Sequence, residues 1–99
     1  MTSENKTVLI IDDDQDFLDV ASHLLEDNYA IITARSASDG LQAVQTLPVD
    51  AVVCDVNMPH MNGLEFLSEL RKISSNRIPV MLVTAGIEPF DFHSSTFRA

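Results

Sequence analysis

Residues 8–14 read VLIIDDD, a run of four aliphatic residues that ends in three aspartates. A continuous aliphatic run of this length is typical of a strand that is covered on both faces of a parallel sheet. Two later segments repeat the arrangement, because residues 51–54 precede Asp55 and residues 80–83 precede Thr84. Since all strands of a parallel sheet end at the same edge, we expect these polar side chains to face one another across a small cleft.

The acidic side chains at this edge point to a metal ion. Three or four carboxylates in one cleft repel one another unless a hard cation lies among them. Mg²⁺ prefers oxygen ligands and is often bound together with phosphate groups. The sequence therefore favours Mg²⁺ and phosphoryl chemistry at the carboxyl edge of the sheet.

Helical patterns separate the predicted strands. Apolar residues recur at three- and four-residue spacing, which predicts a helix over about 14–27, a second one capped by Ser38 or Asp39 and ended by Pro48, and a third over about 64–73. Asp14 is the expected cap of the first helix. A short strand is expected over 29–33, which completes the order βαβαβαβ. This order predicts an α/β fold, a doubly wound parallel sheet with right-handed crossovers and helices on both faces.

Length and composition exclude several classes of protein. The 99 residues make one domain, expected over 1–99 with its core at 7–86 and a tail at 87–99 whose structure the pattern does not predict. A formal charge of −9 leaves no basic patch for nucleic acid or an anionic membrane. No Gly-x-Gly-x-x-Gly follows the first strand, so a dinucleotide-binding domain is excluded.

The single cysteine and the distribution of apolar residues indicate a cellular location. Cys54 lies inside an apolar strand, permits no disulfide within the chain, and fits a reducing cytosol. No apolar run approaches the roughly 18 residues of a membrane helix. We therefore expect a soluble cytoplasmic protein.

Together, the motifs resemble the receiver domain of bacterial two-component response regulators. The residues that carry the resemblance, over about 7–86, are Asp12-Asp13, Asp39-Gly40, Asp55, the loop Met58-Pro59-x-Met61-x-Gly63, and Thr84-Ala85. The resemblance implies a flavodoxin-like sheet, here incomplete, with four strands in the order 2-1-3-4 and three helices.

The resemblance also implies a role for each site residue. Asp55 would be the phosphoacceptor, whose carboxylate attacks a phosphohistidine on a sensor histidine kinase or a phosphotransfer protein. Asp13 would bind Mg²⁺ directly and Asp12 largely through water, while Asp55 and the backbone carbonyl of Asn57 would complete the protein's share of the ligands. Thr84 would be the switch hydroxyl that bonds a phosphoryl oxygen. Such a chain is a phosphoacceptor with at most self-phosphorylation and dephosphorylation chemistry.

The last residues depart from the family pattern. A receiver domain normally continues with a fourth helix, a fifth strand that ends in a lysine, and a fifth helix, and the sequence stops before any of these patterns. Lys6 and Lys72 lie elsewhere. In this interpretation the fourth strand is an unpaired edge. We expect residues 87–97 to pack over that edge or to cross to a second copy, which would make a dimer.

Other interpretations stay open. Asp12-x-Asp14 after an apolar strand resembles the first motif of haloacid-dehalogenase-type phosphatases, although the threonine expected soon after it is absent. A non-catalytic receiver-like module for protein contacts fits the missing lysine and predicts no response to Mg²⁺ or phosphodonors. His23 and His60 are interpreted as a helix-surface residue and a loop residue and not as metal ligands.

Overall fold

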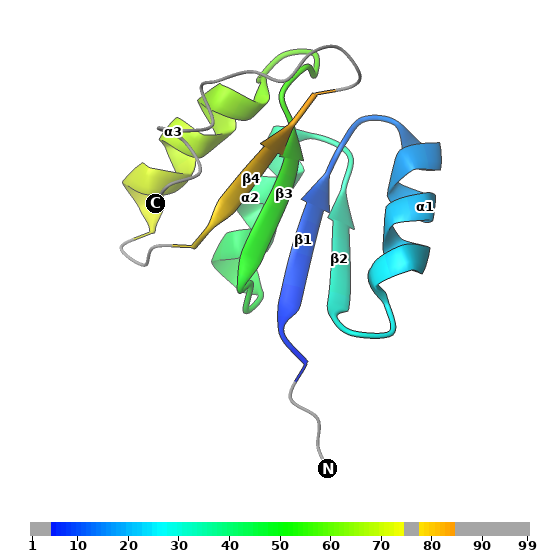
Figure 1. The fold of residues 1–99 in the computed structure, drawn as a ribbon. Helices are drawn as coiled ribbons and strands as arrows, with labels where there is room; N and C mark the ends of the chain where they lie inside the picture. The colour runs from blue at the N-terminus through cyan, green and yellow to red at the C-terminus, as the bar shows by residue number, and fades with distance from the viewer. Residues whose placement is uncertain (1–4, 75–77, 85–99) are drawn as a thin grey trace.

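The computed structural model describes residues 5–74 and 78–84, and within these ranges strands and helices alternate along the chain (Figure 1). The elements are β1 (Thr7–Ile11), α1 (Gln15–Leu25), β2 (Ala30–Ala34), α2 (Ala37–Thr46), β3 (Ala51–Asp55), α3 (Gly63–Ile73) and β4 (Val80–Val83). The expected tail at 87–99 lies outside the described residues. None of the described helices has the length and apolar character that crossing a membrane requires.

The four strands form one parallel sheet in the order β2-β1-β3-β4. This arrangement confirms the flavodoxin-like prediction, with β1 and β3 in the middle. Ile11 pairs with Ala34 on one side and with Cys54 on the other. The carboxyl ends of the three strands are therefore level, and the residues that follow them share one edge.

Side chains of β1 alternate between two apolar cores. Leu9 and Ile11 pack with Phe66 of α3 on the face that α2 and α3 cover. Ile10 packs with Leu18 of α1 on the opposite face. Figure 1 shows α1 well apart from the pair α2 and α3. Because both faces are apolar, β1 needs the continuous aliphatic run that its sequence has.

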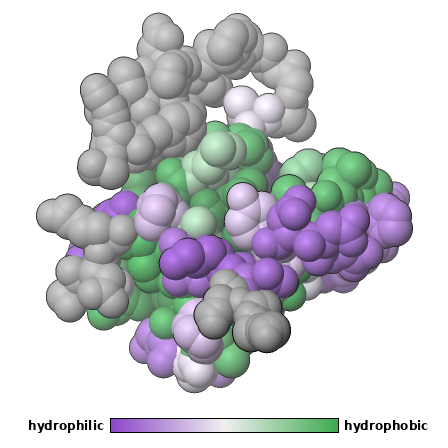
Figure 2. Space-filling view, turned by 60° about the horizontal axis from the view of Figure 1, so that its bottom comes forward, coloured by the Kyte–Doolittle hydropathy of each residue, from purple (hydrophilic) through white to green (hydrophobic). Residues whose placement is uncertain are grey.

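Among the described residues, α1 leaves its face of the sheet partly uncovered at β3 and β4. A groove of about 500 Å³ lies there. Its lining includes Val53 of β3 and Met81 of β4, together with Leu25 and Tyr29 at and after the end of α1. Met81 is 55% exposed. Figure 2 shows apolar groups at the molecular surface beside hydrophilic ones. Within the described residues, β4 pairs with β3 alone, as expected for an edge strand.

Local capping explains where the helices begin. Asp14 caps α1 as predicted, and its carboxylate accepts a hydrogen bond from the Asp16 N–H at 3.0 Å. The prediction of Ser38 or Asp39 as the cap of the second helix is wrong. Ser36 is the cap, because its Oγ accepts from the Asp39 N–H at 3.1 Å, so α2 starts two to three residues earlier than predicted.

Cys54 lies in the core as expected. Its side chain is fully buried, and burial raises the pKa of the thiol to about 12. The thiol is therefore protonated at neutral pH and packs as a small apolar group.

Candidate functional site

The sheet brings the three predicted carboxylate ligands together. One carboxylate oxygen from each of Asp12, Asp13 and Asp55 lies within 4.8 Å of the other two. Asp12 and Asp13 follow β1, and Asp55 is the last residue of β3, the neighbouring strand. The parallel register that pairs Ile11 with Cys54 therefore sets Asp12 level with Asp55. Oxygen ligands at this spacing fit a Mg²⁺ ion, which takes one or two carboxylates and keeps several waters.

An open cavity of about 360 Å³ lies at this edge of the sheet. Four of its lining residues are ones that the sequence predicts for the site: Asp12, Asp13, Asp55 and Thr84. The other three are Asp14, Phe17 and Val83. Phe17, in the first turn of α1, is 39% exposed and forms one wall of the cavity.

Two of the carboxylates are buried. Asp12 is 8% exposed and Asp55 is 9% exposed, whereas Asp13 is exposed. Burial raises the pKa of Asp12, and the Asp14 N–H, which donates to Asp12 Oδ1 at 2.9 Å, offsets part of this shift. Burial likewise raises the pKa of Asp55, and the hydrogen bond from the Asn57 N–H at 3.2 Å lowers it in part. Repulsion among the aspartates adds to both shifts. A bound cation would offset both the burial of the charged carboxylates and the repulsion among them.

The loop after β3 connects the acid cluster to Thr84. The Asn57 backbone N–H donates to Asp55, while its side-chain Nδ2 lies 3.4 Å from Thr84 Oγ1, a long hydrogen bond. Thr84 follows β4, so the loop joins the ends of two neighbouring strands. The structure thus places Asn57 and Thr84 at the site, and their roles as metal ligand and switch hydroxyl stay predictions.

Gly63 lets α3 begin against the end of β3. A Cβ atom at this position would lie 2.6 Å from the Asp55 carbonyl oxygen and 2.9 Å from the Val56 Cα atom. Both contacts are with backbone and closer than such atoms approach, so only glycine fits. The Gly63 N–H donates to the Val56 carbonyl at 3.0 Å, which closes the loop that carries Asn57.

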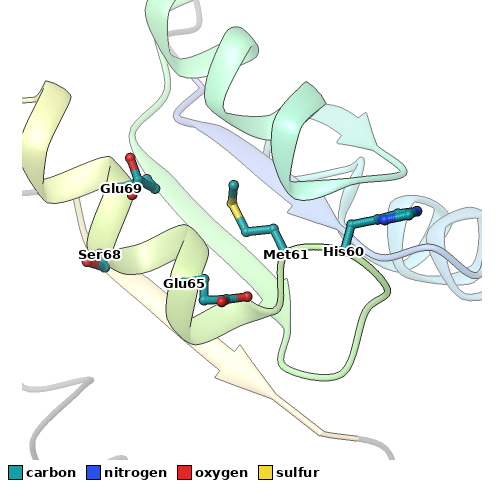
Figure 3. A pocket seen from close by; sticks show the side chains of 5 residues that line it. All are labelled: His60, Met61, Glu65, Ser68 and Glu69. Carbon is teal, nitrogen blue, oxygen red and sulfur yellow. The ribbon is translucent and has the colours of Figure 1, made fainter.

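His23 is exposed on α1 and His60 lies exposed in the loop before α3, which are the positions predicted for them. Among the described residues, the group able to hold a metal ion contains three aspartates and neither His23 nor His60. His60 has a positive φ of 71° in the loop before α3. It lines a separate pocket of about 220 Å³ with Met61, Glu65, Ser68 and Glu69 (Figure 3).

One contact was missed by the sequence analysis. Arg35 follows β2 directly, and its Nη2 donates to the backbone carbonyl of Asp13 at 3.2 Å. The available signal was its place at the end of a predicted strand, the same kind of position that identified Asp12 and Asp55.

Comparison with known proteins identifies the family. The model of the response regulator receiver domain matches residues 8–96, ten residues beyond the limit of 86 that the motifs suggested. The CpxR homolog of Haemophilus influenzae, a transcriptional regulatory protein, is 40% identical over 86 residues. The alkaline phosphatase synthesis transcriptional regulatory protein PhoP of Bacillus subtilis is 32% identical over 88 residues. These alignments cover 85% and 88% of this chain, which spans 36% of the length of each relative.

Solved structures agree with this relationship. The N-terminal domain of a response regulator receiver protein from Methanoculleus marisnigri superposes with a TM-score of 0.82 at 32% identity, over 93% of this chain and 79% of that one. The chemotaxis protein CheY4 of Vibrio cholerae gives a TM-score of 0.76 at 30% identity, over 87% of this chain and 73% of that one. The chain therefore belongs to the response regulator receiver domains of two-component systems.

Proposed function

We propose that this chain is the phosphoacceptor of a two-component pathway in the cytoplasm, and that Asp55 receives a phosphoryl group from a phosphohistidine of a sensor histidine kinase or a phosphotransfer protein. The observation that carries the proposal is the convergence of Asp12, Asp13 and Asp55 within 4.8 Å at the mouth of one cavity. Such a cluster supplies both a cation site and a carboxylate nucleophile.

Mg²⁺, when bound, would neutralise charge on the phosphoryl oxygens. The exposed Asp13 carboxylate is the residue best placed to bind the ion directly. Asp12 is buried, and its Oδ1 already accepts the Asp14 N–H, which leaves it less oxygen surface to offer. This difference supports the roles that the family resemblance implies, in which Asp13 binds Mg²⁺ directly and Asp12 binds it largely through water.

Asp55 is held for nucleophilic attack. The backbone N–H of Asn57 donates to Oδ1 of its carboxylate at 3.2 Å, which orients the carboxylate at the cavity edge. In the transfer step a bond forms between a carboxylate oxygen of Asp55 and phosphorus, and the bond from phosphorus to the donor imidazole nitrogen breaks. The imidazole leaves with its electron pair and takes up a proton. Thr84 would then donate its hydroxyl hydrogen to a phosphoryl oxygen.

Incubation with acetyl phosphate and Mg²⁺ tests this proposal. We expect intact-mass spectrometry to show the gain of one phosphoryl group, which is lost on chelation of the metal and in Asp55→Asn. Asp16→Asn, which makes the same change at an exposed position of α1, should be phosphorylated like the wild type. No mass gain under these conditions would favour the non-catalytic module, and turnover of a generic phosphomonoester would favour the phosphatase.

We also propose that the chain self-associates through the β4 edge. Support comes from the pairing of β4 with β3 alone within the described residues and from the exposure of Met81. Sedimentation at tens of micromolar should show a dimer that added salt strengthens, because two copies of charge −9 repel each other. A strictly monomeric profile at high salt would contradict this proposal and leave the phosphoacceptor proposal unaffected.

A further inference from the structure

Two consecutive residues at the end of β2 hold the acidic segment, which is residues 12–14, through hydrogen bonds to Asp12 and Asp13. The Asp12 N–H donates to the Ala34 carbonyl at 3.1 Å, and the next residue along β2, Arg35, donates from Nη2 to the Asp13 carbonyl at 3.2 Å. The first bond continues the ladder between β1 and β2. The second comes from a side chain, so it depends on which residue occupies position 35.

Arg35 differs from the other basic residues of the described chain in its position. Lys6 precedes β1, at the opposite edge of the sheet, and Arg71 and Lys72 lie in the last turn of α3. Arg71 donates to the Ile78 carbonyl at 2.9 Å, and Lys72 pairs with Glu69. Among the described lysines and arginines, Arg35 alone contacts the acidic segment.

The contact adds a second anchor to the Asp13–Asp14 peptide group, whose N–H already donates to Asp12 Oδ1 at 2.9 Å. The Asp13 side chain is exposed, and two buried carboxylates lie close by and repel it. Without the Arg35 contact, this peptide group is held through its N–H alone, and repulsion can move the Asp13 carboxylate outward and away from Asp12 and Asp55. A hydrogen bond from a permanently charged guanidinium is a stronger anchor than one from a neutral donor.

We propose that Arg35 is a positioning residue that holds the Asp13 peptide, and thereby sets the affinity of the acid cluster for a divalent cation. The proposal rests on the phosphoacceptor function given above, since it assumes that the cluster binds Mg²⁺. Arg35 touches neither the ion nor the phosphoryl group and acts through Asp13.

Calorimetric titration with Mg²⁺ distinguishes positioning from simple charge repulsion, because the two effects have opposite signs. Arg35→Ala removes a positive charge near the site, which by electrostatics alone would tighten cation binding. If Arg35 positions Asp13, the same change weakens binding, by about three- to ten-fold for the loss of one exposed hydrogen bond. We expect the weaker binding.

Arg71→Ala is the matched control, because it also removes an exposed arginine that donates to a backbone carbonyl, but at the other end of α3. It should leave the Kd for Mg²⁺ unchanged. Equal or tighter binding by Arg35→Ala, or equal weakening by Arg71→Ala, would overturn the proposal while the phosphoacceptor function stands. Absence of Mg²⁺ binding by the wild type would overturn both.

Discussion

Asp13→Asn is expected to lose most of the affinity for Mg²⁺ with little change in the stability of the fold. Asp13 contributes one of the three converging oxygens, and its carboxylate is the exposed member of the cluster. Removing a full negative charge next to a divalent cation costs on the order of ten-fold or more in affinity. Because Asp13 is exposed, the same change removes no packing from either core. Calorimetric titration with Mg²⁺ measures the first effect, and thermal unfolding of the metal-free protein measures the second.

Asp16→Asn is the matched control for this experiment. Asp16 is an exposed aspartate in the first turn of α1, three residues beyond Asp13, and it lies outside the group of converging carboxylates. Asp16→Asn changes the net charge by the same amount as Asp13→Asn, so any general effect of charge on cation binding appears in both variants. Equal loss of Mg²⁺ affinity in the two would show that net charge, and not coordination by Asp13, determines binding.

Asp55→Asn should make the metal-free protein more stable at neutral pH. Burial and repulsion by Asp12 and Asp13 raise the pKa of Asp55, which means that the folded state holds the ionised group less favourably than the unfolded chain does. Asparagine keeps the shape and the oxygen that accepts the Asn57 N–H but carries no charge. We expect a gain on the order of 1 kcal/mol, or about 4–8 °C in Tm for a domain of this size. Thermal unfolding of the metal-free proteins measures the gain.

The pH dependence of this gain follows from the direction of the shift. A folded pKa above the unfolded value means that Asp55 favours the folded state most at low pH, where it is protonated, and loses this contribution as the pH rises through the folded pKa. The difference in Tm between Asp55→Asn and the wild type should therefore grow with rising pH and then level off. Mg²⁺ should reverse it by stabilising the wild type more than the variant. A metal-free variant that is less stable than the wild type at neutral pH would contradict the account.

The central part of the fold follows from the sequence because local signals and the sheet agree there. Residues 8–11 are aliphatic at every position, and the structure shows why, since the side chains of Leu9 and Ile10 point into opposite cores. The strand order came from the family resemblance. Because Asp12 and Asp55 directly follow or end neighbouring parallel strands, the sequence places both at one edge of the sheet without any information on side-chain contacts.

What the sequence did not predict depends on contacts between distant residues. The cap of α2 is Ser36, whose Oγ accepts from the Asp39 N–H, so the helix begins at Ala37, before the residues that the apolar pattern marks as helical. The contact from Arg35 to Asp13 joins residues 22 positions apart, and no local pattern encodes it. Phe17 has the apolar spacing of α1, yet it lies in the first turn of the helix and lines the cavity.

A crystal of this chain grown with Mn²⁺ offers the most direct test of the central claim, because Mn²⁺ takes the same oxygen ligands as Mg²⁺ and can be located by anomalous scattering. The account predicts one strong anomalous peak at the carboxyl edge of the sheet, with Asp12, Asp13 and Asp55 around it, and no comparable peak near His60 and Glu65. A peak elsewhere, or none at a Mn²⁺ concentration that saturates binding in solution, would contradict it.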